Sequence, residues 1–254
     1  MINGTAIQVL WLREMKRFFR AKARVIGALA MPLFFLGFLG MGFRRMTIPG
    51  MSEEVGYINF LIPGILGMSL LFSSTFGGLS VLWDKEFGFL KEIMVAPVSR
   101  ISIVLGRIAG GVTTAMIQGV LILSISLLIG FRIPSLPALV LAFVFMVLIS
   151  VTFLGVGLIF ASKMRDMQGF NIVFNFVIFP IFFLSGALYP LENFPTWLRA
   201  ISYADPLTYG IDGLRAVLIG ASSYPVYLDL GIMGAFALLM ITLGAYFFEK
   251  SEAT

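Results

Sequence analysis

The sequence contains neither cysteine nor histidine, and charged residues make up only 12% of its 254 positions. Without cysteine there are no disulfides and no thiol chemistry. Without histidine there are no imidazole metal ligands and no histidine-mediated proton transfer. A water-soluble fold also needs more polar surface than this composition supplies. These absences exclude many of the side chains that enzymes commonly use for catalysis, and they argue against a soluble protein.

Long apolar runs dominate the chain instead, since 59% of the residues are hydrophobic and 26 are phenylalanine. A transmembrane β-barrel would show alternating segments of about ten residues, whereas these runs are continuous. About 20 apolar residues cross the hydrocarbon core as a helix, and six stretches qualify. We therefore expect an all-α polytopic membrane protein with one transmembrane domain over residues 1–254 and spans at about 25–43, 57–82, 101–130, 136–162, 170–190 and 227–248.

The distribution of basic residues orients these spans, because cytoplasmic loops are rich in Lys and Arg. With the N-terminus inside, twelve of the 18 Lys and Arg fall in cytoplasmic segments and five in outer segments. Arg107 is the remaining one and lies inside the third span near its cytoplasmic end. This pattern explains the net charge of +5 without nucleic acid, for which no basic face with interleaved aromatics is present. Both termini are expected in the cytoplasm.

The N-terminal residues 1–24 are expected to form a cytoplasmic amphipathic helix. This pattern suits a helix at the membrane interface, held by apolar burial and by anionic lipid. A basic flank that only sets the topology is the alternative. Basic residues recur on one side of the helix and apolar residues on another, namely Arg13, Arg17, Arg20 and Arg24 against Leu12, Met15, Phe19 and Ala23.

Two features that would indicate a specific function are missing from the sequence. No GxxxxGK[ST] motif occurs, so the chain has no nucleotide-binding loop of this kind. No span carries an Asp or Glu at its midplane, which weakens a proton-driven carrier and an intramembrane enzyme together. Small residues at spacings of four allow close helix contact, either inside one bundle or at a dimer seam. They are Gly106 and Gly110 in one span and Ser69, Ser73 and Gly77 in another.

A short charged segment at 83–100, WDKEFGFLKEIMVAPVSR, joins the second and third spans. Phe87, Leu90 and Met94 share one face of a helix there, and Pro97 ends that helix because it disfavours helical geometry in the residues before it. An amphipathic helix between two spans can dock in a partner's groove. It can also lie on lipid, and the residues alone leave both readings open.

A second unusual segment follows the fifth span, at 191–226. Prolines interrupt it repeatedly, and it contains two short helical patterns. Irregular backbone at membrane depth is tolerated only against protein or water. We therefore expect a re-entrant or interfacial helical hairpin at the outer face, with Trp197, Tyr203 and Tyr209 at headgroup level.

With these segments in place, the chain resembles the membrane-spanning permease subunits of type-2 ABC exporters, which serve drug, polysaccharide and lipo-oligosaccharide export. The resemblance covers nearly the whole chain and is most specific in EFGFLKEIMVAPVSR and SGALYPLENFPTWLR…DPLTYGIDGLR. It implies that the 83–100 loop is the coupling helix that docks on an ATPase subunit, through Lys85, Glu86, Phe87, Gly88, Leu90, Lys91, Glu92, Met94 and Pro97. It also implies an outer hairpin that caps the substrate path, marked by Gly186, Pro190, Pro195, Trp197, Pro206 and Arg215.

The resemblance implies a multi-pass protein of a prokaryotic inner or plasma membrane. Its expected partners are membrane lipids, two copies of an ABC ATPase subunit and a second permease, either the same chain or a sister chain. The ATPase subunits, not this chain, would bind ATP and Mg²⁺ and hydrolyse ATP. The substrate is expected to be amphipathic or lipid-like and to move between the two permease halves. A secondary transporter or channel that works without an ATPase is the main alternative.

Overall fold

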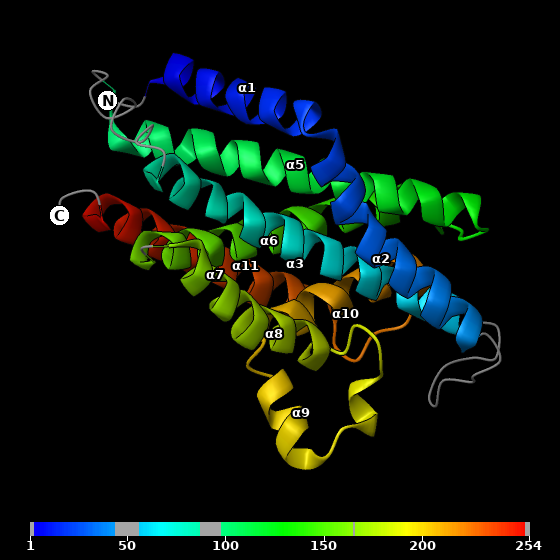
Figure 1. Cartoon of the computed structure of the whole chain (residues 1–254). Coiled ribbons are helices and arrows are strands. Elements are labelled where there is room, and N and C mark those ends of the chain that lie inside the picture. The colour runs from blue at the N-terminus through cyan, green and yellow to red at the C-terminus, as the bar shows by residue number, and fades with distance from the viewer. Residues whose placement is uncertain (1–2, 44–55, 87–97, 165, 252–254) are drawn as a thin grey trace.

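The computed structural model describes residues 3–43, 56–86, 98–164 and 166–251. Every regular element in these residues is a helix, and six helices are long and apolar enough to cross a membrane (Figure 1). The expected all-α fold with six spans is therefore confirmed. In chain order the elements are α1 (Gly4–Arg20), α2 (Lys22–Gly42), α3 (Tyr57–Glu86), α5 (Arg100–Leu128), α6 (Leu136–Lys163), α7 (Met167–Val173), the π-helical turn η1 (Phe174–Ile178), α8 (Phe179–Leu184), the 3₁₀ turn η2 (Leu191–Asn193), α9 (Thr196–Ser202), α10 (Pro206–Ile219) and α11 (Val226–Ser251).

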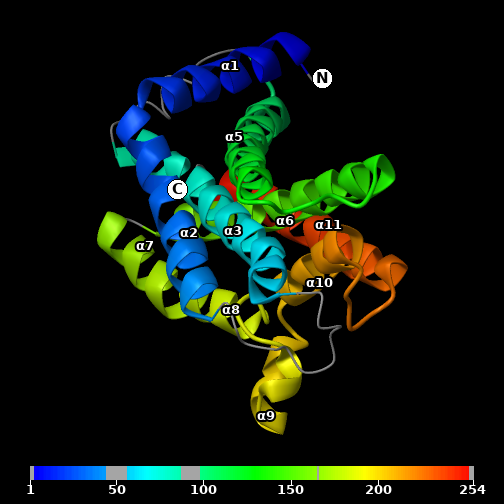
Figure 2. The same cartoon turned by 90° about the vertical axis from the view of Figure 1, so that its right-hand side faces the viewer.

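Helices α3 and α6 form the centre of the bundle (Figure 2). Of the residues in the apolar span of α3, 78% are buried, compared with 17% in the spans of α2 and of α11. Helices α5 and α6 pack on α3, while α11 packs on α6 and α2 lies against α3. The helices α2 and α11 therefore turn most of their side chains outward, where lipid or another subunit can contact them.

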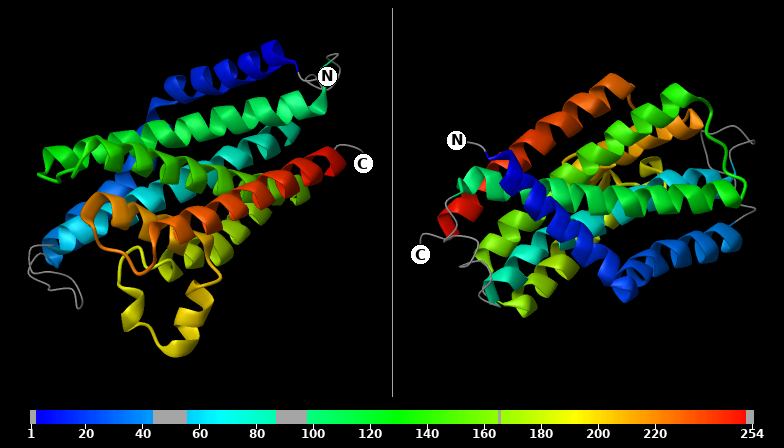
Figure 3. Two further views of the ribbon diagram at one scale, coloured as in Figure 1. Left: turned by 180° about the vertical axis from the view of Figure 1, so that it is seen from behind. Right: turned by 90° about the horizontal axis from the view of Figure 1, so that it is seen from above.

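The start of α1 and the end of α11 lie at the same end of the bundle (Figure 3). Helix α3 ends and α5 begins at this end too, so we call it the loop end. At the opposite end, Ser135 caps the start of α6 by accepting a hydrogen bond of 3.3 Å from the backbone N–H of Ala138, a common helix start. The sequence leaves only Phe131–Ser135 between the spans expected at 101–130 and 136–162, which predicts a hairpin, and α5 and α6 are in contact in the structure.

The fifth span is shorter and less regular than 170–190. It begins at Met167, passes through η1 and ends as a helix at Leu184. In η1 the N–H of Phe179 bonds to the carbonyl of Phe174, five residues earlier. Pro180 follows directly and has no N–H to continue an α-helical ladder. The wider turn accommodates that break, and the chain leaves the helix at Ser185 and Gly186 instead of continuing to 190.

Helix α1 ends at Arg20, so Arg24 belongs to α2 and not to the expected amphipathic helix. The backbone leaves helical geometry at Ala21, where ψ is 58°. This bend lets α1 pack along α5 while α2 enters the bundle. On α1 the buried side chains Leu10, Met15 and Phe18 face the protein. Leu12 and Phe19 are exposed instead, as expected of apolar side chains that contact lipid.

Helix α1 packs on α5 at the two glycines Gly106 and Gly110. A Cβ at Gly106 would lie 2.8 Å from the Cβ of Leu10, and a Cβ at Gly110 would lie 2.7 Å from the Cβ of Glu14. Real Cβ atoms do not approach this closely. Of the two roles open for this GxxxG motif, the structure therefore selects packing within one chain.

Helix α10 lies inside the bundle, against α3, α6 and α11, whereas α9 projects away from it (Figure 1). The two short helices of the expected hairpin are thus present but differ in burial. Leu207, Ile211 and Leu214 of α10 are fully buried. Asp205 caps this helix, because its Oδ1 accepts a 2.8 Å hydrogen bond from the N–H of Leu207.

We predict that Asp205 makes the stability of the fold depend on pH. Burial raises the pKa of this carboxyl to about 8, and the Leu207 hydrogen bond opposes the rise only in part. The folded chain therefore keeps a proton that the unfolded chain releases near pH 4. Stability contributed by Asp205 should be full below about pH 4 and fall as the pH rises to about 8.

Thermal unfolding of the purified protein between pH 5 and 9 tests this prediction. Asp205→Asn keeps the cap and should flatten the decline in melting temperature, whereas Asp205→Ala should also lose about 1 kcal/mol of capping stability. Equal pH slopes for the wild type and Asp205→Asn would refute the assignment.

Candidate functional site

The carboxylate of Asp84, near the end of α3, joins three helices at the loop end. Asp84 is only 5% exposed. Arg13 of α1 forms two hydrogen bonds to it, of 2.8 Å from Nη2 to Oδ1 and 3.1 Å from Nη1 to Oδ2. Arg107 of α5 places Nη2 2.8 Å from Oδ2, and Arg17 of α1 lies 3.9 Å from Oδ1. We call these residues, with Glu14, the Asp84 cluster.

Burial makes the Asp84 cluster energetically important. The side chain of Arg107 is 4% exposed, and those of Arg13 and Arg17 are 28% and 27% exposed. Glu14 adds a second negative charge, with its Oε2 at 2.9 Å from Arg17. Removing one partner of a buried ion pair typically costs about 3–5 kcal/mol, and water reduces that cost where the arginines are partly exposed. The helices α1, α3 and α5 are therefore held together at this point.

Further hydrogen bonds tie α1 to α5 on the other side of the same loop. Ser99 caps the start of α5 and Ser102 lies in its first turn. The backbone N–H of Asn3 donates to Ser102 Oγ at 2.8 Å. The indole N–H of Trp11 donates to Thr113 Oγ1 at 3.0 Å. The segment between Glu86 and Val98 connects the end of α3 to the start of α5. Helix α1 contacts both of these helices.

The residues expected in the coupling helix lie in or beside this segment. Lys85 and Glu86 form the end of α3, which extends past the expected span end at 82. The others, Phe87, Gly88, Leu90, Lys91, Glu92, Met94 and Pro97, lie outside the described residues. Their role remains a prediction.

At the opposite end of the bundle, Arg215 of α10 is the central side chain. Its Nη2 donates to the carbonyls of Gly186 and Ala187, at 2.7 and 3.0 Å. The guanidinium carbon lies 3.7 Å from the centre of the Phe60 ring, a cation–π contact. Burial lowers the pKa of Arg215 to about 10, and the charge of Asp212 opposes this shift, so the side chain stays charged at neutral pH. It holds the turn after α8 against α3.

Among the other expected hairpin residues, Gly186 joins this contact through its carbonyl, and the rest surround it. Gly186 adopts a left-handed backbone with φ +72° and starts the turn. Pro190 precedes η2, Pro195 precedes α9, and Pro206 is the first residue of α10. Trp197 is 66% exposed, as expected of a side chain at headgroup level. Tyr209 is only partly exposed, because it lies on the more deeply packed α10.

Sequence reasoning missed the pairing of Asp84 with Arg13, Arg17 and Arg107. A signal was present, since a lone arginine inside a span needs an acidic partner and Asp84 lies at the same depth beside the neighbouring loop. Asp212 was missed as well. Its carboxylate accepts backbone hydrogen bonds from Ser223 and Tyr224 and fixes the turn before α11. Among the described residues, no group of three or more acidic side chains is arranged to hold a metal ion.

Comparison with known proteins places this architecture in a family. The model of the ABC-2 type transporter family matches residues 5–219. A putative transport permease, ycf38, of Cyanophora paradoxa is 30% identical over 213 residues, which cover 82% of this chain and 73% of the relative. The inner membrane transport permease YadH of Escherichia coli K12 is 28% identical over 91% of this chain and 90% of its own. Nodulation protein J of Rhizobium meliloti is 27% identical over 93% and 90%. The chain therefore belongs to the ABC-2 type transporter family and is a multi-pass protein of the inner membrane.

Proposed function

We propose that the chain forms half of the translocation path of an ATP-driven exporter and works with a separate ATPase subunit. The observation that carries this proposal is the Asp84 cluster, which joins α1, α3 and α5 next to residues 87–97. Family membership supports an ATPase partner in general. A second permease, identical or sister, and a second ATPase copy would complete the assembly. The substrate would be amphipathic or lipid-like.

The cluster suggests how motion would pass from the partner into the membrane. An ATPase that moves residues 87–97 would pull on the end of α3 and the start of α5. Because Asp84 pairs with Arg13, Arg17 and Arg107, α1 would move with them instead of staying at the membrane surface. The start of α1 and the end of α11 lie at this end of the bundle (Figure 3), as a cytoplasmic position of both termini would require.

The hairpin around Arg215 would act as the outer cap of the path. Its contacts with Gly186, Ala187 and Phe60 connect the turn after α8 to the start of α3. A shift of α3 at the loop end would therefore reach the hairpin through one continuous helix of 30 residues.

The loop itself provides the direct test of the proposed function. We predict that Phe87→Ala and Glu92→Ala weaken association of the chain with its partner ATPase, because they would remove an apolar contact and a charge from the expected docking face. Co-purification and substrate-stimulated ATP hydrolysis in proteoliposomes measure this. Unchanged association and hydrolysis would refute the coupling role, and transport without any ATPase would favour a secondary transporter or channel.

The Asp84 cluster gives a second prediction. Asp84→Asn should leave the ATPase bound but lower substrate-stimulated hydrolysis by about tenfold, which corresponds to roughly 1.4 kcal/mol of activation free energy. The reason is that the three arginines lose the charge that holds α1 to α3 and α5.

Asp166→Asn is the matched control, since Asp166 is exposed and an asparagine can keep its hydrogen bond from the N–H of Gly169. It should leave hydrolysis unchanged. Equal loss in both variants, or loss in neither, would contradict a coupling role for the cluster.

A further inference from the structure

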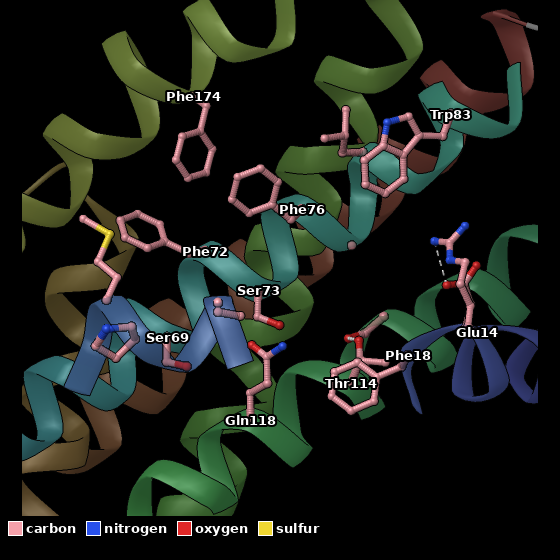
Figure 4. A pocket seen from close by; sticks show the side chains of 18 of the residues that line it. Glu14, Phe18, Ser69, Phe72, Ser73, Phe76, Trp83, Thr114, Gln118 and Phe174 are labelled. Atoms are coloured by element: carbon pink, nitrogen blue, oxygen red, sulfur yellow. Dashed lines mark hydrogen bonds and ion pairs between the residues drawn. The ribbon is translucent and has the colours of Figure 1, made fainter. Parts of the chain in front are cut away.

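A cavity of about 540 Å³, partly open to its surroundings, is lined by α1, α2, α3, α5 and the irregular fifth span. Figure 4 shows that its two long sides differ in character. The side chains of Ser69, Ser73, Thr114 and Gln118 lie along one side, and the rings of Phe72, Phe76 and Phe174 lie along the other. The cavity is therefore amphipathic across its width.

The polar side of the cavity contains a buried hydroxyl group that has no hydrogen-bond partner among the described residues. Ser69 is 3% exposed, and its Oγ has no hydrogen-bond partner among the described residues. Buried Ser126, Ser150 and Ser162 each bond to a carbonyl of their own helix, as Ser126 does to Ile122 at 2.9 Å, whereas Ser69, like buried Ser74, does not. Gln118 is 5% exposed and lines the same side. A buried hydroxyl without a hydrogen bond destabilises the fold, and a bound molecule with hydrogen-bonding groups would supply the missing bond.

The aromatic side is built as one contiguous wall. The ring centres of Phe76 and Phe174 are 4.4 Å apart, and those of Phe72 and Phe179 are 5.2 Å apart. Such a wall favours an apolar or aromatic body over a hydrated solute.

Two breaks in regular helix geometry also border the cavity. Pro32 of α2 has no N–H for the carbonyl of Ala28, and both residues line the space. On the other flank Phe174 begins the π-helical turn η1, and such turns are frequent at functional sites. Backbone groups freed from the helical ladder add hydrogen-bonding capacity beside the wall.

Charged groups close the end of the cavity near the Asp84 cluster. Glu14 and Arg17 form an ion pair there, beside Trp83, and Glu14 Oε1 has no hydrogen-bond partner among the described residues. The pair is neutral, while Arg13, Arg17 and Arg107 outnumber Asp84 and Glu14 nearby. This end is suited to a hydroxyl or amide donor and disfavours a free cation.

We propose that this cavity within a single subunit binds the transported molecule, and that the molecule is a drug-sized amphiphile with an apolar body and uncharged hydroxyl or amide groups. The assignment rests on the proposed transport function and narrows its substrate. A volume of about 540 Å³ falls in the range of pockets that hold drug-sized ligands. The site also differs from the expected path along the seam between two permease halves.

The test uses the intact chain in phosphatidylcholine nanodiscs and a dodecyl glucoside with a photoreactive diazirine in its alkyl chain. Saturable labelling should map by mass spectrometry to α3 and η1. Gly27→Phe should weaken labelling by about tenfold or more, because Gly27 borders the cavity and its Cβ position has no atom within 4 Å. The substitution fills the space without a backbone clash.

Gly37→Phe is the matched control, since Gly37 is also in α2, also has open space at its Cβ position and does not line this cavity. It should label as the wild type does. Gln118→Leu, similar in size, should weaken labelling roughly fivefold by removing a hydrogen-bonding group. Thermal unfolding of each variant verifies the fold.

Labelling that is diffuse along the chain, or equal in Gly27→Phe and the wild type, would overturn the cavity assignment. Saturable labelling that Gly27→Phe removes would support it even if the wild type failed to couple to any ATPase. In that case the transport function, and not the cavity, would be refuted.

Discussion

The buried carboxylate of Asp84 is the contact on which the organisation of the loop end depends. A charge in this position is unfavourable unless it is paired, and its partners come from two other helices. Arg13 and Arg17 bring α1 to it, and Arg107 brings α5. Without that carboxylate, three arginines would face one another at the edge of an apolar bundle. Beside this cluster, α1 packs on α5 at Gly106 and Gly110, where no Cβ would fit without a shift.

A second buried charge, Arg215, organises the opposite end in a different way. It uses backbone carbonyls and an aromatic ring instead of a carboxylate. Between these two ends the interior is mostly apolar, with scattered buried hydroxyls such as Thr75 and Ser150, and the cavity lies where the fifth span and α2 depart from regular helix geometry. The long helix α3 connects all three regions, and its central position in the bundle makes it the natural route for motion between them.

The sequence was sufficient for the features that depend on composition and local chemistry. Continuous apolar runs predicted six spans, and the short link at Phe131–Ser135 predicted the pairing of α5 with α6. Repeated prolines predicted an irregular segment after the fifth span. These signals are local, because an apolar run or a proline has much the same effect wherever it occurs in the fold.

The features that depend on contacts between helices could not be predicted from patterns along the chain. Periodicity marked α1 as amphipathic, but it could not tell that Arg13 and Arg17 face a carboxylate of α3 as well as solvent and lipid. The spacing of Ser69, Ser73 and Gly77 indicated close packing, which the structure shows at Gly77 against Gly111 and Leu154. The pattern did not reveal that all three residues also line a cavity. The break at Ala21 and the turn η1 result from tertiary packing that a pattern along one helix does not contain.

The central claim is that the Asp84 cluster makes α1 and the start of α5 move as one unit. Because the chain has no cysteine, spin labels at Val9→Cys and Ile101→Cys, both exposed positions, can report their separation in the complex with the ATPase. The account predicts one narrow distance distribution, the same without nucleotide and with ATP, that broadens when Asp84→Asn is added. A separation that changes with ATP in the otherwise unaltered chain would contradict it.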